Sequence, residues 1–347
     1  MEDSKQIKEK IEEVMILRVI ATLLLLVLHS FTVYMGGWRS IDCIDNVVSY
    51  KWIAAISYSC VLELFVFISG YVLAWQLQRR QPAFISFVLK KAKRLLLPGL
   101  VFSILYILCF GTFNESSFVA IISGVGHMWY LPMLFWTFVA GWLLHSMKCP
   151  VWIKLVICLL LCLISSYLNF LPFRIGRTCY YILFFYLGMV TFSRKRGILE
   201  WLTLRKIWGM FFTFLILFVS LTYFKEALAT IHLTLFPLKF LRNIVVNCST
   251  IASSLAGVCS VYASVVYWLS NRASWKPSPL LTRLNITSFG TYLFHQFILQ
   301  FLYYHTLLPY ITGTYLLPWV GLLVTLVGSV FLSELCLRTR LGRSLIG

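Results

Sequence analysis

The stretch RVIATLLLLVLH, residues 18–29, places an arginine and a histidine at the two ends of an otherwise apolar run. At about 100° per residue, the eleven positions from Arg18 to His29 bring both side chains back to nearly the same face of a helix. At about 1.5 Å per residue, they stand roughly 16 Å apart along its axis. With its flanks the run is long enough to cross a bilayer, where ionisable side chains are costly and therefore indicate a functional site.

The composition assigns the rest of the chain to the membrane as well. Of the 347 residues, 60% are hydrophobic and 12% are charged, whereas soluble globular chains average about 25% charged residues. The formal net charge of +18 is carried by short basic clusters between apolar runs, which is typical of the positive-inside pattern. We therefore expect the lipid bilayer as the surroundings and no nucleic-acid partner. The ten cysteines have neither zinc nor disulfide spacing, so we predict no metal site.

Apolar runs that could each form a transmembrane helix recur along the sequence. We predict an all-α, polytopic integral membrane helical bundle with about ten transmembrane helices. The basic residues concentrate in alternate loops, so both termini are expected to be cytoplasmic. The runs lie at 14–35, 51–75, 95–112, 128–147, 151–170, 178–192, 207–224, 241–269, 286–307 and 317–337.

No internal repeat or low-complexity linker divides the chain, so we predict a single transmembrane domain over residues 1–347. Residues 1–13, MEDSKQIKEKIEE, are expected to form a short cytoplasmic surface helix. The first apolar run is too long for a signal-peptide core and has no small-residue cleavage site, so we expect it to be retained. These features predict a multi-pass protein of the inner or plasma membrane. Whether it forms a homo-oligomer stays open.

Three ionisable side chains in the first two runs each allow a structural and a functional interpretation. Arg18 could extend its guanidinium to the cytoplasmic interface, or it could hold an anionic group of a long substrate. His29 could be a hydrogen-bonded histidine of the bundle, or a general base that accepts a proton from a hydroxyl near neutral pH. Glu63, in VLELFVFISGY at 61–71, is a lone carboxylate that suits either a structural ion pair or a functional site.

A basic cluster precedes the third apolar run, in FVLKKAKRLLLP at 87–98. Its residues Lys90, Lys91 and Arg94 serve membrane topology in the simplest interpretation. In the functional interpretation, they form a rim that binds the phosphates of a nucleotide-like donor.

Three further motifs carry candidate site residues. Two of them place a histidine, a tryptophan and two arginines toward the outer side of the membrane, and the third places a histidine inside the ninth run. Tryptophan is common at membrane interfaces, and its ring also offers a face for stacking a sugar. Arginines in an outer loop run against the positive-inside trend, so they either bind an anionic ligand or are tolerated in a short loop. The motifs are GHMWYLP at 126–132 with His127 and Trp129, FRIGR at 173–177 with Arg174 and Arg177, and SFGTYLFH at 288–295 with His295.

Taken together, these segments resemble the membrane-bound acyltransferase 3 family, which includes bacterial sugar O-acetyltransferases. An arginine, ten residues and a histidine in the first helix are the family hallmark, and Arg18 to His29 fits it. VLELFVFISGY is similar to the second-helix motif, with Glu63 in place of the more usual aspartate. FVLKKAKRLLLP is similar to the basic motif before the third helix, with Lys91 where an arginine is frequent. GHMWYLPML, FFYLGMV and SFGTYLFH resemble the fourth-, sixth- and ninth-helix signatures, so the resemblance extends to about His295.

The resemblance implies transfer of an acyl group, usually acetyl, from cytoplasmic acetyl-CoA or another short acyl-CoA. The acceptor would be a hydroxyl of a glycan or lipid-linked sugar at the outer face. His29 would act as general base or carry the acyl group briefly, while Arg18 would orient the donor or stabilise charge. The full set of implied site residues is His29, Arg18 and Glu63 for catalysis, Lys90, Lys91 and Arg94 for CoA, and His127, Trp129, Arg174, Arg177 and His295 for the acceptor.

Two alternatives stay open at the level of sequence. About ten helices and intramembrane charges fit a transporter or flippase of a lipid-linked or acylated sugar equally well. A non-catalytic relative that binds glycans would keep the fold, although retention of Arg18, His29, Arg94 and His127 argues against it. The acceptor glycan and the choice between acetyl and succinyl donors are also open.

Overall fold

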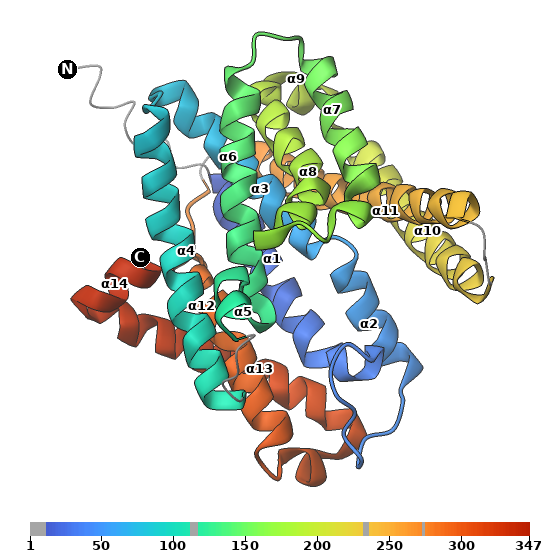
Figure 1. Cartoon of the computed structure of the whole chain (residues 1–347), viewed down its shortest axis with the longest axis vertical. Helices are drawn as coiled ribbons and strands as arrows, with labels where there is room; N and C mark the ends of the chain where they lie inside the picture. Colours follow the sequence, from blue (N-terminus) through green and yellow to red (C-terminus); the bar gives the residue numbers. More distant parts are fainter. Residues whose placement is uncertain (1–11, 112–116, 232–235, 273–274) are drawn as a thin grey trace.

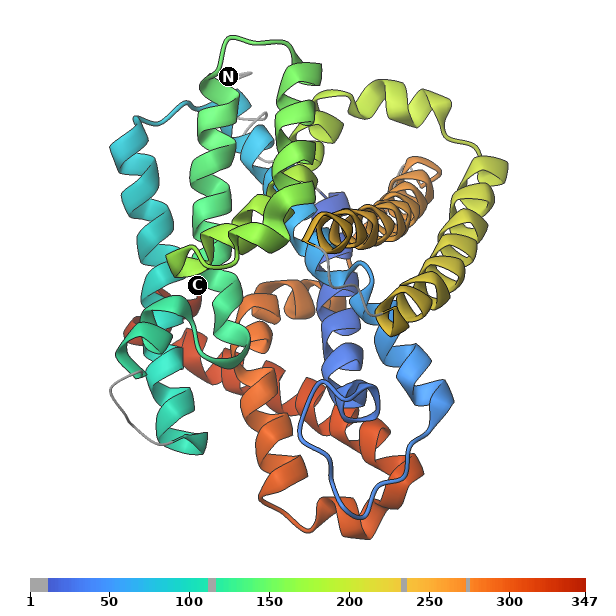
Figure 2. The same cartoon turned by 45° about the vertical axis from the view of Figure 1, so that its right-hand side comes forward.

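The computed structural model describes residues 12–111, 117–231, 236–272 and 275–347, and this part of the chain is helical with no β-strand (Figures 1 and 2). The α-helices are α1 (Glu12–Phe31), α2 (Val48–Tyr58), α3 (Val61–Arg79), α4 (Phe84–Phe110), α5 (Ser117–Ser123), α6 (Tyr130–Ser146), α7 (Val151–Ile164), α8 (Ile175–Ser193), α9 (Lys195–Trp201), α10 (Leu204–Thr230), α11 (Phe236–Ser270), α12 (Pro279–Tyr304), α13 (Leu308–Arg338) and α14 (Arg340–Ile346). The 3-10 helices are η2 (Thr32–Met35), η3 (Gly126–Trp129), η4 (Ser165–Leu168) and η5 (Pro172–Arg174).

The long helices confirm the polytopic helical membrane bundle. Eight segments of the described residues are long and apolar enough to cross a membrane. The 17-residue α6 and the 26-residue α12, which carries several polar side chains, take the two remaining positions predicted from the sequence. Of the surface helix predicted at residues 1–13, the last two residues begin α1 and the others lie outside the described residues.

Two helices differ from the predicted runs. The second run divides into α2 and α3, because the chain leaves helical geometry at Cys60. Helix α4 begins at Phe84, well before the apolar run that starts at 95. The lysines, arginine and leucines between these positions are good helix formers, so the basic cluster lies on α4 itself and not in a loop before it.

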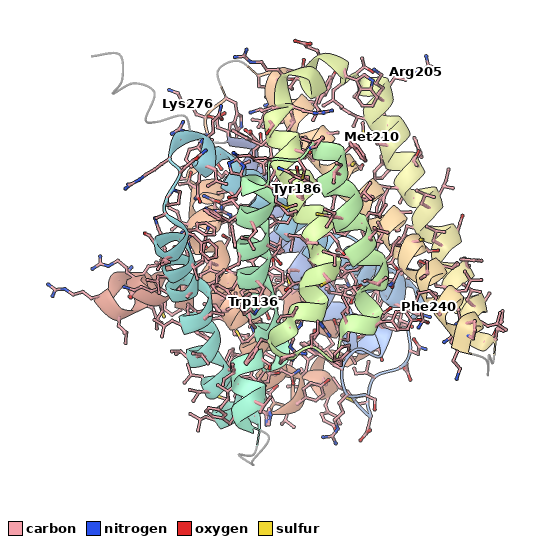
Figure 3. The ribbon with its side chains drawn as sticks, turned by 45° about the horizontal axis from the view of Figure 1, so that its top comes forward. Trp136, Tyr186, Arg205, Met210, Phe240 and Lys276 are labelled. Carbon is pink, nitrogen blue, oxygen red and sulfur yellow. The ribbon has the colours of Figure 1, made fainter. Side chains whose placement is uncertain are left out.

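The ends of the helices show that the bundle alternates in direction as the basic loops predict. A single large cavity is lined by the first residues of α1 and α7 and by the last residues of α3, α6, α8 and α11. Arg205, at the start of α10, and Lys276, just before α12, lie at this same end of the molecule (Figure 3). We call it the basic end, and by the positive-inside rule it faces the cytoplasm. Representative lining residues are Glu12, Arg79, His145, Val151, Arg194 and Ser270.

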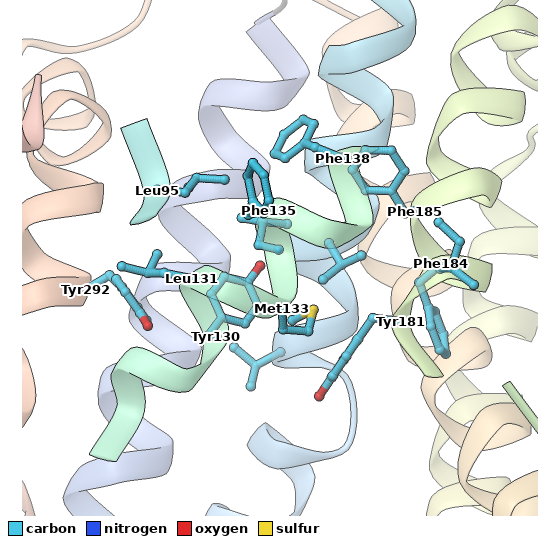
Figure 4. Close-up of a cluster of buried hydrophobic side chains, with 14 of the residues drawn as sticks. Leu95, Tyr130, Leu131, Met133, Phe135, Phe138, Tyr181, Phe184, Phe185 and Tyr292 are labelled. Carbon is cyan, nitrogen blue, oxygen red and sulfur yellow. The ribbon is translucent and has the colours of Figure 1, made fainter. Parts of the chain in front are cut away.

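Aromatic and aliphatic side chains of α4, α6, α8 and α12 form the core around His127 and His295. Figure 4 shows Tyr130 and Leu131 of α6 beside Tyr292 of α12, with Tyr181 and Phe184 approaching from α8. These side chains are buried. The core therefore fixes α6 against α12, which holds His295, and with α6 it fixes the preceding η3, which holds His127.

Helices α3 and α8 approach each other most closely at a reciprocal pair of glycines. A Cβ on Gly70 would overlap the carbonyl oxygen of Phe185, and a Cβ on Gly188 would overlap the carbonyl oxygen of Phe67. Small residues allow close backbone approach between membrane helices. Two of the quoted motifs, VLELFVFISGY and FFYLGMV, are therefore the two halves of one helix contact.

Replacing Gly188 with alanine is expected to destabilise the fold by ~1–3 kcal/mol, the range seen when a packed core is overfilled. The added methyl group has backbone as its neighbour, and backbone cannot rotate away. The measurement is thermal unfolding in detergent. Gly209→Ala is the matched control, because nothing lies within 4 Å of a Cβ at that α10 position. A helix-interior glycine with free space gains about 0.5–1 kcal/mol from alanine, so the two substitutions should shift the melting temperature in opposite directions.

Candidate functional site

Helices α1 and α12 lie side by side, and two polar contacts define their register. Arg18 Nη1 donates to Asn285 Oδ1 at 3.2 Å, and the Gln296 carboxamide lies 3.3 Å from His29 Nδ1. Both contacts join residues 267 positions apart. The two helices therefore run in the same direction, with one polar contact near the basic end and the other about three turns deeper.

Three histidines meet at the deeper contact. The His29 and His295 rings have centroids 4.9 Å apart, and the His127 and His295 rings have centroids 4.8 Å apart. His127 is 5% exposed and His295 is fully buried, while His29 keeps part of its surface accessible. We call His29, His127 and His295 the histidine cluster. Neither this cluster nor any other group of three or more His, Cys, Asp or Glu side chains among the described residues could hold a metal ion.

Gln296 connects two members of the histidine cluster, and hydrogen-bond satisfaction assigns their tautomers. His127 Nε2 lies 3.1 Å from the carbonyl oxygen of Leu293, which can only accept, so this nitrogen carries the proton of a neutral ring. Its Nδ1 then accepts from the carboxamide of Gln296, which lies 2.9 Å away. Because amide oxygen and nitrogen positions are interchangeable by rotation, the carboxamide oxygen then faces His29. That oxygen accepts the single N–H of a neutral His29 ring and lies 3.3–3.4 Å from both ring nitrogens, so the second nitrogen keeps its lone pair.

His295 has one satisfied and one unsatisfied ring nitrogen. Its Nδ1 donates to the carbonyl oxygen of Tyr292 at 2.6 Å. Its buried Nε2 has no hydrogen-bond partner among the described residues. A buried acceptor without a partner is costly, so this nitrogen marks a position where a hydroxyl or a water molecule would be stabilised.

The turn before α6 aims His127 at the histidine cluster. Gly124 has φ +83° and Gly126 has φ +54°, backbone conformations that glycine adopts without strain. They lead into η3, which holds His127, and Tyr292 donates to the His127 carbonyl oxygen at 2.6 Å. The glycine of GHMWYLP is therefore required by the turn that presents the histidine.

Trp38 covers the histidine cluster on the side away from the basic end. Its ring stacks on His29 with centroids 5.8 Å apart and an interplanar angle of 16°. Tyr303 meets the Trp38 ring edge-on at 6.2 Å. An aromatic face therefore lies directly beside the accessible histidine.

Near the basic end, Arg18 lies within electrostatic range of Arg94 on α4. Both guanidinium-bearing side chains keep exposed surface. The Lys91 ammonium lies 3.6 Å from the centroid of the Phe138 ring, and Lys90 is exposed on the same helix. Two arginines from different helices with no carboxylate bonded to either among the described residues favour an anionic ligand between them.

Glu63 lies apart from the histidine cluster. It is 5% exposed on the first turn of α3, and one carboxylate oxygen accepts a hydrogen bond from Tyr180 at 3.2 Å. The other oxygen has no hydrogen-bond partner within the described ranges. No hydrogen bond or ion pair of the described residues joins Glu63 to a histidine, so the structure does not bring the three residues of the implied catalytic set together.

The outer arginines are engaged with the protein itself. Arg174, at φ +65°, donates from Nε to the Ser123 carbonyl oxygen at 3.0 Å and from Nη2 to the Gly124 carbonyl oxygen at 3.3 Å. These bonds fasten η5 to the turn that precedes His127. The exposed Arg177 guanidinium lies 4.0 Å from the centroid of the Trp129 ring, so one face of that tryptophan is already covered.

Sequence reasoning missed Asn285, Gln296 and Trp38. Asn285 and Gln296 repeat the eleven-residue spacing of Arg18 and His29, and that repeat in a second apolar run was the available signal. Trp38 lies in a loop after the first run, where tryptophan is common, and nothing in its surroundings in the sequence distinguishes it.

The fold and the site together define a polytopic helical membrane protein with a histidine cluster inside the bundle and a pair of arginines toward the cytoplasm. The family model described as an acyltransferase domain, that of the acyltransferase 3 family, matches residues 11–338, and the chain belongs to this family. It is therefore a membrane acyltransferase in the general sense. Comparisons with curated proteins and with solved structures gave no match.

Proposed function

We propose that this protein is a cell-membrane O-acyltransferase that moves an acetyl group from acetyl-CoA, or another short acyl-CoA, to a hydroxyl of a cell-surface or lipid-linked glycan. The observation that carries the proposal is the histidine cluster, whose His29 shares a face of α1 with Arg18, while Arg94 of α4 lies within electrostatic range of Arg18. His29 keeps an accessible ring with one unprotonated nitrogen, as a general base requires.

The donor fits the side of the basic end. The phosphates of CoA suit the paired guanidinium groups of Arg18 and Arg94, which bind phosphate oxygens with charge-assisted hydrogen bonds. From there the long pantetheine arm would follow the face of α1 toward His29. Lys90 lies on the rim for a further phosphate contact, while Lys91 is directed toward Phe138 and contributes less.

The acceptor fits the opposite side. Trp38 presents an aromatic ring next to His29, and apolar sugar faces stack on such rings. The unpartnered Nε2 of His295 offers an acceptor for a second hydroxyl of the sugar. His127 holds the arrangement through Gln296, while Trp129, Arg174 and Arg177 would lie on the outer approach of the acceptor.

The reaction then needs one base and one acyl transfer. The free ring nitrogen of His29 takes the proton of the acceptor hydroxyl as its oxygen attacks the thioester carbonyl carbon. The C–S bond breaks, and the sulfur of CoA receives the proton from the imidazolium. One ester and one thiol form from one alcohol and one thioester, so atoms and charge balance. An acyl-histidine route would use the same nitrogen as the nucleophile.

The test is transfer by the purified protein in liposomes. Acetyl-CoA is supplied with candidate glycans, CoA release is measured with a thiol reagent, and the glycans are examined by mass spectrometry. Acceptor-dependent CoA release with gain of one acetyl ester supports the proposal. A flippase would move a lipid-linked sugar without releasing CoA, and that result would replace the proposal.

Gln296→Leu is expected to lower kcat by about tenfold, which corresponds to the free energy of roughly one hydrogen bond. The substitution removes the carboxamide that orients His29 and His127 and leaves the donor contacts in place, so KM for acetyl-CoA should change little. The measurement is steady-state CoA release.

Gln300→Leu is the matched control, one turn further along α12 and without a hydrogen bond among the described side chains. Equal activity of the two variants would show that the carboxamide bridge has no role in catalysis.

A further inference from the structure

A second polar site lies at the basic end, separate from the proposed transfer site. The cavity that is lined by the ends of six helices has a volume of about 1920 Å³. None of its lining residues belongs to the histidine cluster or to the Arg18–Arg94 pair. Glu13 lines it, and the five positions from Glu13 to Arg18 turn the helix face by about 140°. The cavity therefore lies on the other side of α1.

Lys154 is a lining residue of this cavity whose positive charge has no partner among the described residues. It stands in the first turn of α7 and is 7% exposed. Its ammonium has no hydrogen bond or ion pair with any described residue, and it lies within electrostatic range of His145. A largely buried lysine that lines a cavity and has no counter-charge among the described residues favours an anion that enters the cavity.

Among the described residues, the other charges of the cavity leave it positive. Arg194, Lys195 and Arg196 lie on its rim. The Glu13 carboxylate is already used, because it accepts from Lys195 at 2.6 Å and from Tyr71 at 2.6 Å. Glu12 is the second carboxylate of the lining. It is outnumbered by the remaining basic residues Lys154, Arg194 and Arg196. The excess charge calls for an anionic ligand.

The remaining wall of the cavity is apolar. It consists of aromatic and aliphatic side chains of α8, α9 and α11 at the level where helices leave the membrane. A ligand that fills both parts has an anionic head and hydrocarbon chains. The apolar lining residues are Tyr186, Met189, Val190, Phe192, Leu199, Val266 and Leu269.

We infer that this cavity binds an anionic phospholipid of the cytoplasmic leaflet, with its phosphate on Lys154 and its acyl chains along α8 and α11. Basic pockets between transmembrane helices at the cytoplasmic side are suited to anionic headgroups. The apolar wall and the depth of Lys154 favour a lipid over a free phosphate or a nucleotide. The inference does not depend on the proposed acyltransferase reaction.

The test is lipid binding by native mass spectrometry of the delipidated full-length protein in detergent. Phosphatidylglycerol is compared with phosphatidylcholine of the same acyl chains. We expect preferential retention of phosphatidylglycerol, and we expect Lys154→Gln to weaken it by about fivefold or more, the contribution of one cationic side chain near a lipid phosphate. Lys148→Gln is the matched control, since Lys148 is exposed on the same hairpin and lies outside the cavity lining.

Two further measurements test whether the charge of Lys154 accounts for the lipid preference. Lys154→Arg preserves the charge and should retain phosphatidylglycerol, and the lipid preference of the unaltered protein should fall as salt rises. Equal retention of both lipids by the unaltered protein, or no difference between Lys154→Gln and Lys148→Gln, would overturn the inference. Displacement of the lipid by millimolar inorganic phosphate, or loss of acetyl-CoA affinity in Lys154→Gln, would instead assign the cavity to a free phosphate or to the acyl donor.

Discussion

His29→Ala is expected to lower the rate of acyl transfer by about 10²- to 10⁴-fold, the usual contribution of a positioned general base. The substitution removes the ring whose free nitrogen accepts the hydroxyl proton, whereas Arg18 and Arg94 stay in place for the donor. The loss should therefore appear in kcat, with KM for acetyl-CoA nearly unchanged. The measurement is acceptor-dependent CoA release in liposomes, normalised to folded protein by size-exclusion chromatography.

His305→Ala is the control for a histidine on the same bundle, because His305 is exposed at the end of α12 and contacts Phe110 and Phe301. It should retain full activity. Full activity in His29→Ala with loss in His295→Ala would move the role of base to the buried ring whose Nε2 is unpartnered. Full activity in both variants would reject the histidine cluster as the site of proton transfer.

The transmembrane organisation could be predicted because it follows from terms that act locally along the sequence. Apolar run length fixes which segments can cross a bilayer, and the basic loops fix their direction. The division of the second run into α2 and α3 could not be predicted in this way. Apolar composition is continuous across Cys60, and the change of direction there depends on what packs around it.

The candidate site divides in a similar way between local and long-range information. The face shared by Arg18 and His29 follows from helix geometry alone. Their partners Asn285 and Gln296 depend on α12 lying parallel to α1, and that is a property of the assembled bundle. Glu63 shows the reverse case, because its carboxylate is directed to Tyr180 by the packing of α3 on α8, and no pattern within VLELFVFISGY indicates that direction.

The quoted motifs also serve purposes that their residue types do not show. Gly70 and Gly188 are packing positions, whereas Gly126 sets a turn and thereby aims His127. A motif that includes a histidine or a carboxylate therefore includes residues whose role is to place a helix. Only the structure separates the two kinds of residue, because the separation depends on backbone approach and on φ.

Arg18→Ala is expected to reduce kcat/KM for acetyl-CoA by about 100-fold, as when a strong hydrogen bond between a guanidinium and a ligand phosphate is removed. Arg18 is hydrogen-bonded to Asn285 and lies within electrostatic range of Arg94, so its loss leaves the donor phosphates with one guanidinium in place of two. Because the contact acts on the bound donor as well as on the transition state, most of the change should appear in KM. Steady-state kinetics at several acetyl-CoA concentrations measure it.

Arg205→Ala is the matched control, since Arg205 is an exposed arginine at the same end of the molecule (Figure 3) and should leave KM unchanged. Arg94→Ala should resemble Arg18→Ala. The double variant should lose less than the product of the two single losses, because the two guanidinium groups act on one anion. Fully multiplicative losses would place the two arginines on separate ligands. An unchanged KM in Arg18→Ala, with Arg205→Ala also unchanged, would remove Arg18 from the donor site and leave it as a structural partner of Asn285.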